Sequence, residues 1–539
     1  MHTLALLGDE AVALGALHSG ITAAYGYPGT PSTEIIEYLQ HTQNNLTLAA
    51  WCTNEKTAYE EALGVSYVGR RALVTMKHVG LNVAADPFIN SALLNIRGGL
   101  VLAVADDPGM HSSQNEQDSR FYAEFAKIIC LEPSNQQEAY DMTRLAFDLS
   151  EKFQIPVMIR LTTRLAHSRS VVTPCASQKE NPLLSKIDPS GWALLPSFAR
   201  KQYSNLLKKQ QELLTFVHET PYNSLMVPED SSSKAPLGIL TAGIGKNYFF
   251  ENLEGTPSQF PHLHIGAYPL PTQKLVTLSA KVEKLLIIEE GMPYIEETLR
   301  GILPISVEIR GKLDGTLPPA GELEPELVRA SLGLPLRKSL QVNLPFELPA
   351  RPPQLCQGCP HGDTYTALKQ IIHNLPNAVL TSDIGCYALG AVPPLSLPET
   401  IVCMGASVSM AVGASEAGKH PAIAVIGDST FLHSGITPLI DAVARKVPVT
   451  VIILDNGTVA MTGGQKTVLP SANLPELIKG LGVEPEHVIT IEAHPKYLKE
   501  NQQILEREIQ YPGVSVVIAV RECLETARKK KVELGEKKV

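Results

Sequence analysis

Oxygen-bearing side chains follow two neighbouring apolar runs in the last third of the chain. Asp428 comes directly after AIAVIG, and Asn456 comes directly after TVIILD. Because ligands of open parallel sheets bind at the carboxyl ends of the strands, we expect both side chains to lie in one crevice. Mg²⁺ takes oxygen ligands and shares them with phosphates. The pair, with the main-chain carbonyl of Thr458 as a third ligand, therefore predicts a Mg²⁺ site that holds a diphosphate.

The residues around this pair support an anion site. Gly427 lets the backbone approach a ligand closely, and the helix expected after Ser429 would direct its N–H groups at an anion. Either turn alone is more typical of ordinary turn chemistry after a buried strand. The two together, at a strand–helix–strand spacing, form the Gly-Asp and Asn signature of thiamine diphosphate sites.

The elements that would position these residues alternate between apolar runs and helical patterns. Such alternation predicts parallel sheets covered by helices. We predict three α/β domains, at residues 1–175, 235–345 and 346–539, of which the middle one is the smallest. Residues 176–234 are Pro- and Ser-rich and form a linker with one helix.

The composition predicts a soluble globular enzyme. Hydrophobic residues make up 44% of the 539 residues and charged residues 19%, which is ordinary for that class. The net charge of −9 does not indicate the basic surface that nucleic-acid-binding proteins carry. No apolar run has the length of a membrane span. With no basic segment typical of a secretory signal at the start, we expect a cytoplasmic protein. Its eight cysteines would then be free thiols or metal ligands.

Several motifs carry a resemblance to a known family. They are GDSTFLHSGI, DIGCYALG, CMGAS and AMTGGQ in the last third, and GYPGTPSTEI, TNEKTAYEEALG and ALVTMKHVGLNVAADP in the first. In order and content they resemble the large (alpha) subunits of indolepyruvate ferredoxin oxidoreductases, in the thiamine diphosphate-dependent 2-oxoacid:ferredoxin oxidoreductase family. The resemblance implies three doubly wound domains, with two thiamine diphosphate-binding-type folds flanking a smaller transketolase C-terminal-like domain. It also implies that Ser407, in CMGAS, contacts the cofactor.

The resemblance implies an activity as well. Aryl 2-oxoacids such as indolepyruvate or phenylpyruvate would be oxidatively decarboxylated, with coenzyme A taking the acyl group. Electrons would leave one at a time through an iron–sulfur cluster to ferredoxin or another acceptor. The resemblance also implies a smaller beta subunit, which would form a heterotetramer with a homodimer of this chain. Two alternatives stay open: a non-oxidative decarboxylase that releases an aldehyde, and a catalytically idle structural partner.

The first domain contributes four further candidates. From the local sequence alone, Glu55 is typical of an acidic residue in the first turn of a helix. The resemblance instead implies that Glu55 activates the aminopyrimidine of the cofactor and that Thr30 donates a hydrogen bond to the substrate. Lys77 and His78, at a predicted strand end, would contact the substrate carboxylate or an oxyanion. A Lys-His pair more often lies on the protein surface without a specific function. The polar loop 106–120 is either a solvated loop or a binding loop.

Four cysteines suggest the electron route. Large subunits of the family normally carry a ferredoxin-like module with two C-x₂-C-x₂-C-x₃-C runs, and this sequence shows none, so we expect a different exit. In pyruvate-type members a C-x₂-C pair, a third cysteine and a distant fourth hold a cluster. The resemblance implies one [4Fe–4S] cluster on the matching residues, Cys356, Cys359, Cys386 and Cys523. A structural zinc site and unligated cysteines are the alternatives, and Cys403 could replace one of the four.

Overall fold

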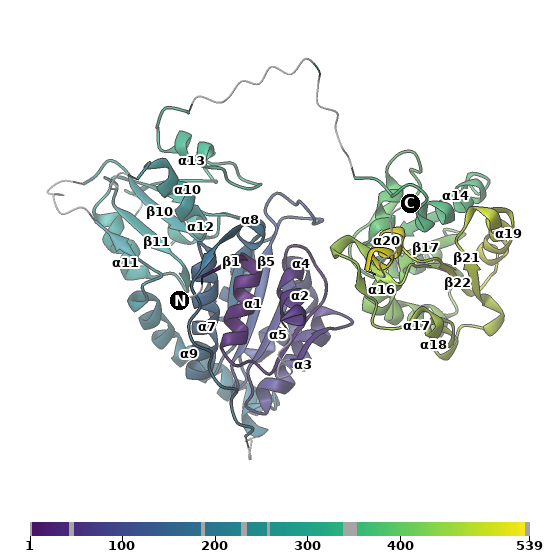
Figure 1. The fold of residues 1–539 in the computed structure, drawn as a ribbon, viewed down its shortest axis with the longest axis horizontal. Helices are drawn as coiled ribbons and strands as arrows, with labels where there is room; N and C mark the ends of the chain where they lie inside the picture. Colours follow the sequence, from purple (N-terminus) through teal and green to yellow (C-terminus); the bar gives the residue numbers. More distant parts are fainter. Residues whose placement is uncertain are drawn as a thin grey trace. The chain divides into compact units, whose positions relative to one another are not determined.

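The computed structural model describes residues 3–42, 48–184, 189–227, 234–255, 259–304, 306–337, 346 and 353–533. The chain divides into two compact units, Met1–Val342 and Asn343–Val539, and each is described by itself (Figure 1). No helix among the described residues is long and apolar enough to cross a membrane.

The first unit contains a seven-stranded sheet in the order β12-β6-β7-β5-β4-β2-β3. Its strands are parallel except for β12, which pairs antiparallel with β6. The central strands are buried along their whole length, as apolar runs without alternation require when helices cover a parallel sheet. The strands are β2 (Ala23–Gly26), β3 (Leu48–Trp51), β4 (Ala72–Lys77), β5 (Leu100–Asp106), β6 (Ile129–Leu131), β7 (Val157–Thr162) and β12 (Ala267–Tyr268).

Helices alternate with these strands, as predicted. The two-stranded β1–β8 ladder (Leu4–Leu7 with Arg169–Val172) lies next to them. Ser32 precedes the second helix, but its hydroxyl donates to the Gly29 carbonyl and makes no cap hydrogen bond. The helices are α1 (Gly8–His18), α2 (Thr33–His41), α3 (Glu55–Tyr67), α4 (His78–Val83), α5 (Ala85–Ser91), α6 (Arg120–Ala126), α7 (Gln136–Phe153) and α8 (Thr163–His167).

A five-stranded sheet in the order β14-β13-β10-β11-β9 completes the first unit. The long helix α9 (Pro196–Glu219) buries Leu206, Leu213 and Val217 in the same hydrophobic core as both sheets. The other elements are β9 (Leu225–Met226), β10 (Gly238–Ala242), α10 (Gly245–Asn252), β11 (His262–Ile265), α11 (Thr272–Ala280), β13 (Lys284–Ile288), α12 (Tyr294–Arg300), β14 (Glu308–Arg310) and α13 (Pro325–Ser331).

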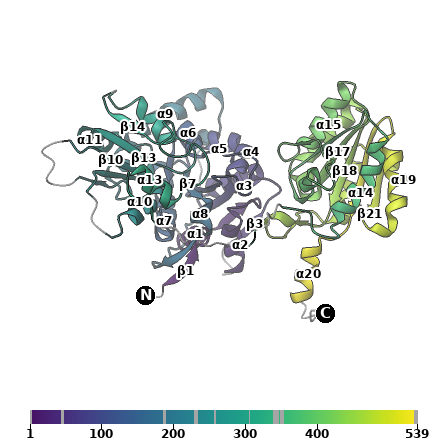
Figure 2. The same cartoon turned by 90° about the horizontal axis from the view of Figure 1, so that it is seen from above.

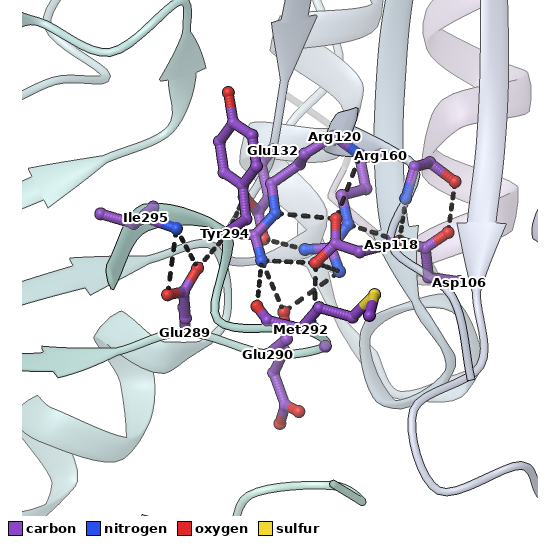
Figure 3. A network of polar contacts seen from close by, with 12 residues as sticks. Asp106, Asp118, Arg120, Glu132, Arg160, Glu289, Glu290, Met292, Tyr294 and Ile295 are labelled. Carbon is purple, nitrogen blue, oxygen red and sulfur yellow. Dashed lines mark hydrogen bonds and ion pairs between the residues drawn. The ribbon is translucent and has the colours of Figure 1, made fainter. Parts of the chain in front are cut away.

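Buried ion pairs connect the loop after β13 to the seven-stranded sheet (Figure 3). Arg160 of β7 donates to Asp106 at the end of β5 over 2.6 Å. Arg120, at the start of α6, pairs with Glu289 over 2.8 Å, and Asp118 lies between the two guanidinium groups. Because a buried charge is costly unless it is paired, these contacts fix the two loops against each other.

The second unit is built on a six-stranded, wholly parallel sheet in the order β16-β15-β17-β18-β22-β21. Alternate residues of its strands enter two separate cores. Ala424 and Ile426 pack with α15, α17 and α18, and Ile423 and Val425 pack with α14 and α19 on the other face (Figure 2). The strands are β15 (Val379–Ser382), β16 (Thr400–Ile401), β17 (Ala422–Gly427), β18 (Val449–Asp455), β21 (Val488–Glu492) and β22 (Val514–Val520).

The helices of this unit follow the strands in the order expected of a doubly wound fold. A single π-helical turn, Phe431–Gly435, separates the short α16 from α17. The helices are α14 (Pro360–His373), α15 (Ala406–Glu416), α16 (Asp428–Thr430), α17 (Ile436–Arg445), α18 (Leu474–Gly480), α19 (Leu498–Ile509) and α20 (Leu524–Glu533).

Candidate functional site

The ends of β17 and β18 lie side by side in the second unit. The two strands are parallel, with Gly427 opposite Leu454, so Asp428 and Asn456 emerge at the same edge of the sheet. Both side chains are buried, at 5% and 8% exposure. The structure therefore brings together the two residues that the sequence proposed as Mg²⁺ ligands.

A second acid, Asp455, lies beside Asp428. Burial raises the pKa of Asp428 well above its ordinary value, and the Asp455 carboxylate raises it further. Asp428 accepts from the Gly457 N–H over 3.1 Å, while one oxygen of Asp455 is buried without a hydrogen-bond partner among the described residues. Two buried carboxylates with an oxygen left over match the donor set that Mg²⁺ prefers.

The turn after β18 holds Asn456 in a fixed orientation. The Asn456 amide oxygen accepts from the Thr458 N–H over 3.0 Å, and its Nδ2 donates to Nε2 of His361 over 3.1 Å. Burial lowers the pKa of His361 to about 4, so the ring is neutral and can accept. Gly457 has φ of +70°, a conformation that favours glycine. His361 was not among the predicted site residues, although it lies two residues after the C-x₂-C pair.

The predicted cofactor residues Gly427, Ser429 and Ser407 belong to the same unit. A Cβ at Gly427 would come within 2.7 Å of the Tyr387 ring, so only glycine fits there. Ser429 is the second residue of α16. Ser407, at the start of α15, donates its N–H to Asp383 over 2.9 Å. Asp383, which sequence analysis also missed, thus anchors the first turn of α15 to the end of β15.

Four cysteines line one cavity of about 120 Å³ in the second unit. They are the four that the sequence proposed as cluster ligands: Cys356, Cys359, Cys386 and Cys523. The fifth candidate, Cys403, is exposed and does not line it. His361 and Asn456 do line it, so Asn456 belongs both to the cysteine cavity and to the strand-end site.

The thiols of this cavity influence one another. Burial raises the pKa of Cys386 to about 12, and the other three cysteines contribute to the rise. Among the described residues, no three of these sulfurs lie within 4.8 Å of one another. Around one tetrahedral zinc ion, with Zn–S bonds of about 2.3 Å, the sulfurs would be about 3.8 Å apart. The arrangement is wider than a single-ion site and leaves room for a larger group.

In the first unit, Glu55 begins α3 and is buried, at 5% exposure. The helix is capped by Asn54, whose side chain accepts from the Thr57 N–H over 2.8 Å. A Cβ at Gly80 would lie 2.6 Å from a Glu55 carboxylate oxygen, so the start of α4 packs directly on this carboxylate. The glutamate is therefore held in place and shielded from water.

Lys77 ends β4 and His78 begins α4 in the same unit, and both are buried, which rules out the alternative that they lie on the surface. Burial lowers the pKa of Lys77 to about 8, and Asp107 and Glu55 partly offset that fall. Lys77 donates to the Ser112 carbonyl over 2.7 Å. Burial also lowers the pKa of His78. A Cβ at Gly29 would lie 3.1 Å from the Lys77 stem, so the turn that carries half-exposed Thr30 packs on this lysine.

The loop 106–120 is not simply solvated. Asp107 accepts hydrogen bonds from Ser113 and from Thr163, which holds the first half against the sheet. Its last residues, Asp118 to Arg120, are buried in the ion-pair network. The middle of the loop contacts Lys77 through Ser112 and therefore lies over the end of β4.

Comparisons with known proteins agree with this arrangement. The thiamine diphosphate-binding domain of pyruvate flavodoxin/ferredoxin oxidoreductases matches residues 14–194. The C-terminal thiamine pyrophosphate-binding domain of thiamine pyrophosphate enzymes matches residues 383–519. A solved 2-oxoglutarate:ferredoxin oxidoreductase from Magnetococcus marinus, 17% identical, shares the fold with a TM-score of 0.52 over 61% of this chain and 65% of that one.

Curated relatives extend over nearly the whole sequence. The IorA subunit of indolepyruvate oxidoreductase from Archaeoglobus fulgidus is 37% identical over 96% of this chain and 86% of its own length. The IorA subunit from Methanothermobacter thermautotrophicus is 36% identical over 97% of this chain and 87% of its own length. The chain is therefore an enzyme of the thiamine diphosphate-dependent 2-oxoacid oxidoreductase family and belongs, within it, to the IorA subunits of indolepyruvate oxidoreductases.

Proposed function

We propose that this chain oxidatively decarboxylates aryl 2-oxoacids, such as indolepyruvate and phenylpyruvate, and passes the electrons to a [4Fe–4S] cluster of its own. One observation carries the proposal: Asn456 lies both at the strand-end site and in the wall of the four-cysteine cavity. A cofactor site and an electron acceptor in direct contact are what a one-electron oxidation requires. The aryl substrate is supported by the names of the IorA relatives.

In the second unit, Asp428, Asn456 and the Thr458 carbonyl would hold Mg²⁺, and Gly427, Ser429 and Ser407 would surround the diphosphate. The buried acids at these strand ends supply the negative charge that the cation needs. When bound, thiamine diphosphate supplies a nucleophilic thiazolium carbon and an electron sink for decarboxylation. The protein's own contribution there is to fix the ion and exclude water.

In the first unit, Glu55 would serve as the acid partner of the aminopyrimidine, and its burial keeps competing water away. With a pKa of about 8, Lys77 is mostly protonated at neutral pH and can hold the substrate carboxylate. His78, whose pKa is lowered by burial, donates its Nε2–H to the Asn115 carbonyl over 3.2 Å, and it would donate that proton to the keto oxygen by exchanging this partner. Thr30 would donate a further hydrogen bond to the substrate.

Further components follow from the relatives. Their names describe IorA as a subunit, which supports a complex with a partner, the smaller beta subunit. A homodimer of this chain within a heterotetramer is part of the same proposal. The solved neighbour has coenzyme A and succinyl-CoA bound, which supports coenzyme A as the acyl acceptor here. Ferredoxin or another one-electron carrier would then reoxidise the cluster.

Replacing Asp428 with Ala removes an oxygen ligand of Mg²⁺, and the diphosphate then loses its charge compensation. We expect the variant to fold but to lose bound thiamine diphosphate, measured as cofactor content after gel filtration with Mg²⁺ present. Asp441→Ala, at an exposed position of α17, is the matched control and should keep the cofactor. Normal cofactor content in Asp428→Ala would show that the metal assignment is wrong.

Replacing Glu55 with Gln keeps the shape of the side chain but removes the acid. General acid–base contributions are about 10²–10⁴-fold, so Glu55→Gln should bind the cofactor and turn over at least about a hundredfold more slowly. Single-turnover kinetics with indolepyruvate measures this effect. Glu60→Gln, on the exposed side of α3, should be unaffected. Near-normal turnover of Glu55→Gln would remove this residue from the mechanism.

The cluster is tested by iron content. Anaerobically purified protein should be brown and contain about four irons per chain, as Cys₄ ligation of one cluster requires. Cys386→Ser and Cys523→Ser should lose most of that iron, whereas Cys175→Ser, at an exposed position, should keep it. Colourless, iron-free protein that still decarboxylates would contradict both the cluster and the oxidative reaction, and would favour aldehyde release.

A further inference from the structure

Three metal-ligating side chains that take no part in the proposed reaction converge in the first unit. Asp9 lies in the first turn of α1, Glu34 in the first turn of α2, and His167 is the last residue of α8. Helix α1 contacts both other helices (Figures 1 and 2). One ligand atom of each residue lies within 4.8 Å of the other two. Among the described residues, no other three His, Cys, Asp or Glu side chains are grouped so closely.

Asp9 is the residue that needs an explanation. Its side chain is fully buried, and no hydrogen-bond donor among the described residues reaches either carboxylate oxygen. Burial raises the pKa of Asp9 well above its ordinary value, and the Glu34 carboxylate raises it further. A buried ionised carboxylate without a partner is strongly unfavourable. The backbone that carries Asp9 is held in place, because Gly8 packs closely on α8. A Cβ at Gly8 would lie only 2.2 Å from the Leu165 carbonyl oxygen.

The other two groups form an ion pair in which Glu34 raises the pKa of His167 and His167 lowers that of Glu34, and their spacing also matches coordination. His167 Nε2 lies 3.5 Å from Glu34 Oε2, which is long for a hydrogen bond. The same Glu34 oxygen is buried without a hydrogen bond among the described residues. Zn²⁺ binds nitrogen and oxygen at about 2.0–2.1 Å in tetrahedral geometry, which places its ligand atoms about 3.4 Å apart.

We propose that Asp9, Glu34 and His167 bind one Zn²⁺ ion, which joins the first turns of α1 and α2 to the end of α8. Two carboxylates balance the charge of the ion, and a neutral imidazole suits Zn²⁺ better than Mg²⁺. The side chains of Glu34 and His167 are each 35% exposed, so the ion can enter from solvent and water can complete the tetrahedron. Asp9 closes the site from the buried side.

A proton shared between Asp9 and Glu34 is the competing explanation, because it too would relieve the repulsion of two carboxylates. The two explanations predict different stabilities for the Asp9→Asn variant. An amide N–H donates to Glu34 without any ion, so the shared-proton arrangement predicts a variant at least as stable as the natural protein. Zinc ligation predicts a variant that has lost its metal and the stability that depends on it.

The test uses the full chain after treatment with a chelator, titrated with Zn²⁺ or with Co²⁺ as a spectroscopic substitute. With Mg²⁺ present to occupy the strand-end site, we expect one equivalent of Zn²⁺ to bind in addition to any metal held by the four cysteines, and to raise the melting temperature. In a Cys356→Ser, Cys359→Ser background, which excludes the four-cysteine cavity, Co²⁺ should still bind and show no thiolate absorption. Asp9→Asn and His167→Gln should both lose this equivalent, whereas Glu37→Gln, one turn along α2, should keep it.

Two results would overturn the proposal. One is equal Zn²⁺ binding and equal thermal stabilisation in His167→Gln, whose partly exposed position makes the substitution tolerable for folding. The other is a metal-free natural protein whose melting temperature does not respond to Zn²⁺ and is matched or exceeded by Asp9→Asn. The second result would assign the shared proton instead.

Discussion

Two carboxylates buried side by side, Asp428 and Asp455, cannot both be ionised without a cation beside them. The second unit is organised around this constraint. The parallel pairing of β17 with β18 brings the acids to one edge of the sheet. Gly457 turns the chain so that its N–H meets Asp428. In our account magnesium balances this negative charge, and the diphosphate is bound through the magnesium.

Whether a buried charge has a partner within the protein also distinguishes structural from functional groups elsewhere in the chain. In the first unit Arg120 and Arg160 are fully buried, yet each guanidinium finds carboxylates and carbonyls at hydrogen-bond distance. That network is satisfied internally and stabilises the contact between two sheets. By contrast, burial and neighbouring acidic groups raise the pKa of Cys386 and of Asp9, and neither carboxylate oxygen of Asp9 has a hydrogen-bond partner among the described residues. Those are the positions where we place external ions or clusters.

Much of the second unit could be predicted from its sequence. Apolar runs predicted β17 and β18, and the polar residues at their ends predicted Asp428 and Asn456 as neighbours. The strand β21 was missed because VITIE is only half-buried, and its apolar residues alternate with Thr490 and Glu492 instead of forming a continuous apolar run. Spacing and family resemblance suggested four cysteines and left Cys403 as a possible replacement, and the lining of the cavity, which includes Cys523 but not Cys403, separates the two.

Partners that depend on tertiary contacts could not be predicted. Asp383 and His361 look like ordinary turn and helix residues until the sheet brings them to Ser407 and Asn456. Likewise, the end of loop 106–120 has a polar sequence that predicts exposure, and its burial depends on acids and arginines from distant segments. For these residues the sequence gives the chemistry of the side chain, and the fold alone decides its partner.

The central claim is that substrate electrons enter a cluster within this chain. The most direct measurement is EPR spectroscopy of the complex with its partner subunit, frozen after anaerobic mixing with indolepyruvate, thiamine diphosphate and Mg²⁺. Our account predicts that the signal of a reduced [4Fe–4S] cluster appears on mixing and disappears when an electron acceptor is added. Consumption of the 2-oxoacid with release of an aldehyde and no paramagnetic signal would contradict it.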